Sequence, residues 1–495
     1  MDVDLHRRTV LTTLLQGSAL GLAGLALGGC ETLLEQIRNR PMRRDLATLP
    51  ANDPIIDTYK AAVSAMKALP SSDPRNWTRQ AEIHLNHCPH GNWFFLPWHR
   101  AYLLYFEQIC RELTGNTTFA LPYWNWACNR SIPAVFFGGA SNPLFDGTRT
   151  KGPTDALPLE VVGPNVVTGI LDEPNFLIFA SGPSATQQGP GGSGPLEATP
   201  HNNVHGWISG NMGSYMSPLD PVFWTHHNVI DRIWWDWNVV KGFSNTNDPA
   251  WANFRFTGNF FDRTGAPVDA VAGAMVLGPL LLYQFDQSSL TSCGSPFQTL
   301  AIRDARALQR FLEEGAPVQL RTLRRLQTSA ASEVPVGRSS TQVLRSREAT
   351  ALAESSLPKD VRILVRTQVA RQPPSGEYFV RVFINRPDAT AETPISDPHY
   401  AGSFGFFNDE KAPHARHAEH AGPSTFVVDA TPTIQRLRAM DRIRSGGEVS
   451  VQIVAVPMPG VKPAPRSLPL AAVQLDLAES VTAAPKPMGL AADKR

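Results

Sequence analysis

The sequence has almost no excess of charge of either sign. Its 495 residues include 45 basic and 44 acidic side chains, which leave a formal net charge of +1. A surface without a dominant sign gives no electrostatic reason to bind nucleic acid, so we expect no such partner. The chain is too long for one ordinary hydrophobic core, and we expect two or three structural units.

Cysteine is scarce, with five residues in the whole chain. Their spacing is not the dense pattern of a small disulfide-stapled scaffold. Whether Cys110, Cys128 and Cys293 pair with one another stays open at this point. No internal repeat is present, which excludes a solenoid or a propeller.

Acidic residues are missing from the apolar run between Leu14 and Leu27, which follows two arginines in residues 6–11. This arrangement resembles a twin-arginine export signal of a bacterial protein. The run ends in Leu-Gly-Gly-Cys, similar to a lipoprotein cleavage box with Cys30 as the lipidated residue. We therefore expect residues 1–30 to be a signal and the mature protein to be periplasmic, tethered to a membrane through a lipid on Cys30. An uncleaved N-terminal anchor is the alternative.

The composition changes along the rest of the chain. All eleven Trp residues lie within 42–300, where helical stretches predict the main domain. Residues 301–358 are rich in Arg and Ser and predict a partly helical segment, Arg303–Leu326, followed by a linker. Short β-branched runs separated by Pro and Gly predict a small all-β sandwich at 359–482, and residues 483–495 predict a disordered tail. We thus expect a mainly α fold, a helical-bundle core followed by the sandwich.

Four histidines lie within sixteen residues in the first of two histidine clusters: His84, His87, His90 and His99. Trp77–Asn86 predicts a helix, Pro89 interrupts it, and a new helix is expected to begin near Pro97. Imidazoles that project from a helix, a loop and the next helix can converge on a soft or borderline metal. The alternative, histidines that only satisfy hydrogen bonds in an aromatic core, suits one histidine better than four.

The second cluster begins with His201 and His205, four residues apart and therefore on one face of a helix. His227 follows in a third predicted helix, with Asp231 on the same face. We expect Asp231 either to orient an imidazole or to pair with Arg232.

No acidic residue lies between His201 and His205, where residues 202–204 are Asn, Asn and Val. A zinc hydrolase of the His-Glu-x-x-His type would carry a Glu there. Di-iron bundles need Glu-x-x-His pairs, and none accompanies these histidines. Imidazole supports both oxidation states of copper, so two all-histidine triads favour a pair of copper ions as cofactor.

Two longer motifs now resemble a known family. Residues 96–107 are similar to the copper A signature of the type 3 copper proteins (tyrosinases, catechol oxidases and hemocyanins), and residues 220–231 to their copper B signature. The resemblance implies six metal ligands: His84, His90 and His99 for copper A, and His201, His205 and His227 for copper B. His87 is the rival of His84, because the interval before His90 is short. His226 resembles a neighbour of the ligands and is not assigned as one.

The same resemblance implies three further roles near the metal. Cys88 lies two residues before His90, as in members where a Cys forms a thioether to that ring. Glu197 and Asn202 match a pair that holds a water suspected of deprotonating monophenols, which makes them candidate catalytic residues. The alternative for that pair is a Glu at a helix start with a capping Asn.

The third region also resembles the family. Tyr400–Phe404 is similar to part of the C-terminal domain that covers the active site in plant polyphenol oxidase precursors. This implies that Phe404, Phe406 or Phe407 fills the site and that residues 338–347 form a cleavage region. The alternative is a permanently attached domain that only adds stability.

Together these observations predict a dicopper oxidase. Its expected partners are O2 and small phenols, with monophenols hydroxylated and o-diphenols oxidised to o-quinones, and the enzyme is latent until the C-terminal domain is displaced. The alternatives are a catechol- or aminophenol-only oxidase and a hemocyanin-like O2 carrier. The sequence does not decide the oligomeric state.

Overall fold

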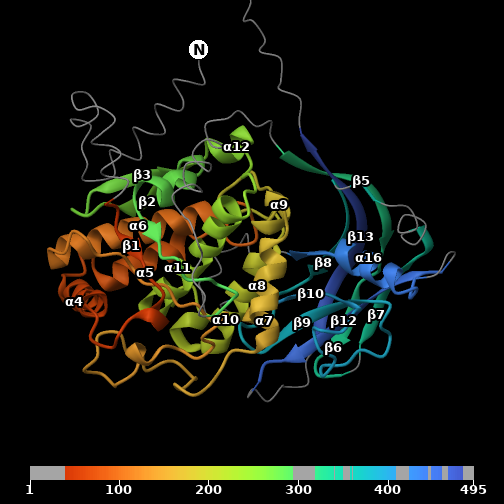
Figure 1. The fold of residues 1–495 in the computed structure, drawn as a ribbon, viewed down its shortest axis with the longest axis horizontal. Helices are drawn as coiled ribbons and strands as arrows, with labels where there is room; N and C mark the ends of the chain where they lie inside the picture. The colour runs from red at the N-terminus through yellow and green to blue at the C-terminus, as the bar shows by residue number, and fades with distance from the viewer. Residues whose placement is uncertain are drawn as a thin grey trace, which may run out of the picture.

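A computed structural model describes most of the chain. The described residues are 39–293, 318–338, 340–348, 357–358, 360–408, 423–443, 447–459 and 467–482. The expected signal at residues 1–30, with Cys30, and the expected tail at 483–495 lie outside these ranges. Two domains stand side by side, a helical one and a β-sandwich (Figure 1).

Four helices form the frame of the helical domain: α4 (Pro54–Ala68), α5 (Trp77–His87), α6 (Phe95–Thr114) and α11 (Val222–Trp235). Asp53 and Asn76 begin α4 and α5, because their side chains accept hydrogen bonds from the first backbone N–H groups. Gly115 ends α6 in the left-handed conformation that glycine adopts at little cost. The helix expected over Trp77–Asn86 is confirmed, and α6 begins two residues before Pro97.

Shorter elements connect this frame. They are β1 (Met42–Arg43), η1 (Leu46–Thr48), η2 (Ala134–Phe136), α7 (Leu159–Val162), α8 (Pro164–Leu171), α9 (Phe176–Phe179), η3 (Glu197–His201), α10 (Asn202–Ile208), η4 (Gly210–Gly213), η5 (Ser217–Leu219), η6 (Asp236–Val240), α12 (Pro249–Ala252), β2 (Arg255–Phe261), β3 (Pro267–Val271), η7 (Gly273–Leu277), α13 (Gly278–Leu281) and β4 (Gln284–Phe285). A disulfide joins Cys128 to Cys293, whereas Cys88 and Cys110 are free thiols. None of the helices in the described ranges combines the length and apolar character needed to cross a bilayer.

In the described part of the second domain, two sheets are accompanied by the helix α16. One sheet has the order β10-β9-β12-β7, and the other has the order β11-β8-β13-β5 with β6 added to β13. The elements are β5 (Val318–Thr328), β6 (Ser332–Pro335), β7 (Thr341–Ser346), β8 (Val361–Val369), β9 (Tyr378–Ile384), β10 (Tyr400–Phe404), β11 (Ser424–Asp429), α16 (Thr431–Ala439), β12 (Val449–Pro457) and β13 (Ser467–Thr482). The expected helical core followed by an all-β sandwich is confirmed.

The prediction for residues 301–358 was wrong in its described part. Val318–Thr328 is strand β5, not the end of a helix, and β6 and β7 occupy the stretch read as a linker. Nine residues of β5 pair with β13 across the sheet. The apolar side chains of β5 are few and widely spaced, so its strand form depends on a partner almost 150 residues away rather than on its own pattern.

Strand β9 is buried on both faces and thereby joins the two domains. Tyr378, Val380 and Val382 point into the sandwich core, whereas Phe379 and Phe383 pack into the core of the helical domain. This follows from the two-residue period of a strand. The sheet that contains β9 and β12 therefore packs against the second sheet with one face and against the helical domain with the other.

Candidate metal centre

Three histidines from separate elements face one another on the copper A side. His84 projects from α5, His90 from the loop after it, and His99 from the first turns of α6. Their ring centroids lie 5.5 Å (His84–His90), 5.6 Å (His84–His99) and 5.6 Å (His90–His99) apart. Pro89 and the positive φ of Gly91 turn the chain between the helices and so bring the three rings together.

A second triad is built by His201 at the end of η3, His205 on α10 and His227 on α11. The centroids of these rings are 4.6 Å (His201–His205), 5.0 Å (His201–His227) and 5.3 Å (His205–His227) apart. The two triads adjoin, since the rings of His99 and His227 stack at 4.4 Å. The structure thus brings all six predicted ligands into one cluster.

Backbone carbonyls fix the orientation of several of these imidazoles. The Nδ1 atoms of His84, His99 and His205 each lie 2.8 Å from a carbonyl oxygen, of Tyr215, Phe95 and Met212 respectively. A carbonyl only accepts, so Nδ1 carries the proton and Nε2 keeps its lone pair. In His201 the Asn202 Oδ1 atom accepts the Nδ1–H at 2.9 Å. The inward nitrogens are therefore prepared to bind a cation.

Burial keeps these rings neutral. It lowers the pKa of His99, His201, His205 and His227 well below the ordinary value, and the neighbouring imidazoles lower it further. The Nε2 atoms of His99 and His201 have no hydrogen-bond partner within the part of the chain that the structure describes. Buried nitrogens left without partners are costly unless a ligand satisfies them. The donor set is all imidazole, and a pair of copper ions fits it.

His87 and His226 differ from the six. His87 is the last residue of α5, is half-buried and, among the described residues, belongs to none of the groups that could hold a metal. The geometry therefore favours His84 over His87. His226 lies near the second triad, but its Nδ1 accepts a hydrogen bond from Trp126 Nε1 at 3.2 Å. A neutral ring of that tautomer carries its proton on Nε2, which removes the lone pair that a ligand needs.

Cys88 is buried against the first triad. Its Sγ atom lies 3.5 Å from Nδ1 of His90. Desolvation raises the pKa of the Cys88 thiol well above its usual value, so the sulfur is protonated rather than an anionic ligand.

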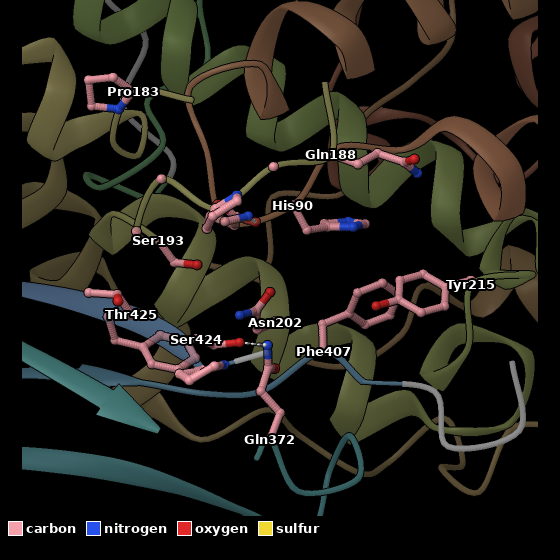
Figure 2. A pocket seen from close by; sticks show the side chains of 18 residues that line it. His90, Pro183, Gln188, Ser193, Asn202, Tyr215, Gln372, Phe407, Ser424 and Thr425 are labelled. Carbon is pink, nitrogen blue, oxygen red and sulfur yellow. Dashed lines mark hydrogen bonds between the residues drawn. The ribbon is translucent and has the colours of Figure 1, made fainter. Parts of the chain in front are cut away.

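Glu197 and Asn202 lie at the edge of the cluster. Glu197 is 2% exposed, and its carboxylate accepts hydrogen bonds from Gly91 N (2.6 Å) and Ser181 Oγ (2.7 Å). Burial raises the pKa of Glu197 to about 7. Asn202 makes no cap, because His201 rather than a backbone N–H donates to its side chain. Both line a pocket of about 210 Å³ between the domains, together with His90 and residues of the sandwich (Figure 2).

The aromatic residue that the sandwich contributes to the site is Phe407. Its ring centroid lies 5.0 Å from that of His90 and 4.5 Å from that of His205, so it faces both triads. Phe404 and Phe406 point instead into the sandwich core. Figure 2 shows Phe407 beside Tyr215, with His90 above them and Asn202 to the left of Phe407. Phe407, the third residue after β10, therefore extends out of the sandwich and lies over the histidines.

Asp231 does neither of the things expected of it. Its carboxylate bonds to Arg43 (2.8 Å), Arg100 and Tyr283, not to a histidine or to Arg232. Arg43 also pairs with Glu107, so two arginines and two carboxylates form one buried network behind the site. Pattern reading missed Arg43 and Tyr283, because both come from segments far from the histidine motifs and lack a local signal. The network fixes α6 to α11, which carry His99 and His227.

Comparisons with known proteins agree with this geometry. The common central domain of tyrosinase matches residues 71–183 and 164–240. Residues 71–240 of the chain therefore resemble the central domain of tyrosinases and polyphenol oxidases. The chain is 32% identical over 248 residues to polyphenol oxidase A1 of Vicia faba, a match covering 41% of each chain. It is 32% identical over 301 residues to tyrosinase HcTyr1 of a Hahella species, covering 49% of this chain and 63% of that one. The chain thus spans less than two thirds of these relatives.

Solved structures show where the family fold extends. A latent aurone synthase (polyphenol oxidase) aligns with a TM-score of 0.64 over 90% of both chains, at 21% identity. Latent apple tyrosinase aligns with a TM-score of 0.61 over 90% of this chain and 97% of that one. Both alignments include the sandwich, so the two-domain fold is shared. The tyrosinase and polyphenol oxidase homologues are copper oxidoreductases.

Proposed function

We propose that this protein is a dicopper oxidase that uses O2 to hydroxylate monophenols and to oxidise o-diphenols to o-quinones, and that the full chain is latent. The observation that carries the proposal is the pair of adjoining all-histidine triads with Phe407 lying over both. His84, His90 and His99 would hold one copper, and His201, His205 and His227 the other. Bound copper supplies the electrons for the reduction of O2 and accepts them from the phenol.

The surrounding residues orient the substrate and handle its proton. Phe95 and Phe223 contact the histidine rings and keep water from their sides. Glu197, with a pKa of about 7, can take a phenolic proton near neutral pH through a water in the adjoining pocket. Among the described residues, each of its two oxygens accepts one hydrogen bond, which leaves lone pairs for that water.

The sandwich accounts for the proposed latency in two ways. The Phe407 ring occupies the face of the triads that a phenol ring would need. The Asn202 amide, the other member of the candidate pair, donates to the carbonyl of Gly405 at 3.0 Å, so the same segment engages it. A substrate can therefore reach the histidines only after residues 405–407 move away.

Two other functions use the same ligands. A catechol- or aminophenol-only oxidase would not need Glu197, and a hemocyanin-like carrier would not need access for a phenol. The buried Glu197 beside the first triad favours monophenol chemistry over the former. The pocket and the removable cover favour an enzyme over the latter.

The test compares the oxidation of a monophenol and a catechol by copper-loaded full-length protein before and after limited proteolysis between the domains. We expect activity on both substrates to rise on cleavage. In a Phe407→Ala background, Glu197→Gln should lower monophenol turnover by about a hundredfold and leave catechol turnover nearly unchanged. Catechol oxidation alone, unaffected by cleavage, would support the catechol oxidase, and no turnover in any state would support the carrier.

We also propose a thioether between Cys88 and the ring of His90, supported by their contact. The new S–C bond replaces the thiol S–H bond and one C–H bond of the ring, and O2, the proposed co-substrate, would accept the two hydrogen atoms and leave as hydrogen peroxide. Peptide mass spectrometry of copper-loaded protein should show a cross-linked peptide lighter by those two hydrogens and resistant to thiol alkylation. A Cys88→Ser variant is the control, and free alkylated Cys88 in the loaded protein would contradict the bond.

Export and lipidation at Cys30 remain proposals that rest on the first thirty residues alone. We expect the wild-type protein in the membrane fraction of a bacterial host and a Cys30→Ser variant in the soluble periplasmic fraction. Recovery of both in the cytoplasm would contradict the export signal.

A further inference from the structure

Ser181 is a buried residue that neither the ligand set nor the proposed cover explains. It follows the short helix α9 (Phe176–Phe179), has 0% exposure and adopts φ = 83°. A left-handed residue after a helix end is usually glycine, because a side chain is disfavoured there. A serine at this position places a hydroxyl in the interior although its φ is disfavoured for a residue with a side chain. Backbone strain of this kind is typical of a functional constraint.

The hydroxyl of Ser181 links the Glu197 side chain to the backbone of Gly194. Its Oγ donates to Oε2 of Glu197 at 2.7 Å and accepts from the N–H of Gly194 at 3.0 Å. Because Gly194 N–H can only donate, the Ser181 proton must point to the carboxylate. The other carboxylate oxygen of Glu197 is held by Gly91 N, next to His90. Glu197 is therefore clamped from both sides, once by backbone and once by the Ser181 side chain.

The segments on either side of this hydroxyl are closely packed. A Cβ atom on Gly194 would lie 2.1 Å from the carbonyl oxygen of Ile178 and 2.8 Å from Ser181 N, so the two segments pack closely, backbone against backbone, beside the Ser181 hydroxyl. Strand β11 of the sandwich holds the same segment, because Ser193 N donates to Thr425 O (2.8 Å) and Val427 N donates to Ser193 O (3.1 Å). The clamp is thus part of the domain interface, and among the described residues the Ser181 hydroxyl is the one side-chain group that donates a hydrogen bond to the Glu197 carboxylate.

We propose that Ser181 is a positioning residue for monophenol hydroxylation, since its hydroxyl aims the Glu197 carboxylate at the pocket beside the first triad. This rests on the proposed function of Glu197. Without the hydroxyl, the carboxylate keeps one hydrogen bond and can rotate about it. Catechol oxidation, which does not need Glu197, then continues while monophenol hydroxylation falls.

The test uses copper-loaded full-length Phe407→Ala protein with Ser181→Gly, Ser181→Ala, Glu197→Gln or Ser184→Ala. Alanine removes only the hydroxyl and keeps a Cβ at φ = 83°, whereas glycine removes the whole side chain and suits that φ, so the two variants together separate backbone strain from hydrogen bonding. Ser184 is a buried serine of the same loop whose hydroxyl bonds to Thr186 O, and its variant is the matched control. The readouts are the ratio of monophenol to catechol kcat, bound copper, and a crystal structure of the Ser181→Gly protein.

We expect Ser181→Gly and Ser181→Ala to lower the monophenol to catechol ratio by about tenfold with unchanged copper, and Ser184→Ala to leave it unchanged. The crystal structure should show the Glu197 carboxylate turned away from its present position. An unchanged ratio in Ser181→Gly beside a lowered ratio in Glu197→Gln overturns this inference and leaves the proposed function intact. An unchanged ratio in both overturns the role of Glu197 as well. If neither substrate is oxidised, an unmoved Glu197 in the crystal structure still overturns the inference, and a displaced one supports it.

Discussion

The two domains bury very different side chains. The helical domain encloses six histidines in two triads, the Glu197 carboxylate, and the network of Arg43, Asp231 and their partners. The sandwich core is formed mainly by aliphatic and aromatic side chains, with valines, isoleucines and leucines from β8, β9, β12 and β13, and its buried Asp476 is paired with Arg325 and Arg366. Buried polar groups cost free energy unless they are paired or bind a ligand, whereas apolar burial stabilises directly. The helical domain therefore carries the chemistry, and the sandwich contributes a stable body that presents Phe407.

The largest expected effect is the loss of copper and activity when a predicted ligand, rather than a neighbouring histidine, is replaced in the helical domain. His99→Ala should reduce bound copper by about one ion per chain and activity by more than about a hundredfold, because ligand loss exceeds the effect of changing an outer-shell partner. His87→Ala is the matched control and should keep both. Copper content by mass spectrometry and catechol turnover check the result. Equal copper loss in the two variants would show that His87 also holds copper, and would contradict the choice of His84 over His87.

The next effect tests whether the sandwich acts through one ring. Phe407→Ala should raise the catechol turnover of the uncleaved chain by on the order of tenfold to a hundredfold, because the closed state no longer excludes the substrate. Phe407→Leu should have a smaller effect, since it keeps part of the bulk. Steady-state oxidation before and after proteolysis measures both. If cleavage activates Phe407→Ala as much as wild type, the cover acts through other residues.

A smaller effect concerns the pH dependence of the contact between the domains. Glu173, which follows α8, hydrogen-bonds through its carboxyl group to Asp429 at the end of β11, and Arg362 lies 3.3 Å from Asp429. Burial, with the adjacent Asp429, raises the pKa of Glu173 from 4.5 to about 8, and burial also raises that of Asp429. The folded state therefore binds more protons than the unfolded state, so this contact is fully stabilising below pH 4.5 and weakens as pH rises to about 8.

Glu173→Gln tests this contact, because glutamine keeps a donor toward Asp429 at every pH. We expect the wild type to lose on the order of a few kcal/mol of free energy of unfolding across that window, and the variant to lose much less. Urea unfolding and the rate of proteolysis between the domains at each end of the window provide the measurements. A pH dependence that is identical in the two proteins would exclude the carboxyl pair as its source.

The smallest effect concerns an ion pair at the domain boundary. Arg381 of β9 lies 3.0 Å from Glu160 of α7, but Arg381 also donates to the carbonyls of Ala391 and Thr393. Glu160→Gln should therefore change the free energy of unfolding by less than about 1 kcal/mol. The midpoint of urea unfolding checks this. A larger shift of the midpoint would show that the ion pair, rather than the apolar packing of Phe379 and Phe383, joins the domains.

The sequence was informative where function requires short, specific motifs. The histidine spacings, the helix at Trp77 and the β-branched run of β9 all had local patterns, and the six predicted ligands come together in the structure. The strand β5 had no such pattern and was read as helix. Asp231 was assigned to the wrong partners, because Arg43 and Tyr283 approach it from distant segments.

The sequence by itself determined the metal chemistry and the order of the two domains, since ligand type, spacing and strand periodicity are local properties of the chain. Only the tertiary structure decided which of three nearby phenylalanines covers the histidines, which carbonyl fixes each imidazole, and how Ser181 reaches Glu197. These contacts join residues far apart in the chain, and close packing rather than local preference selects them.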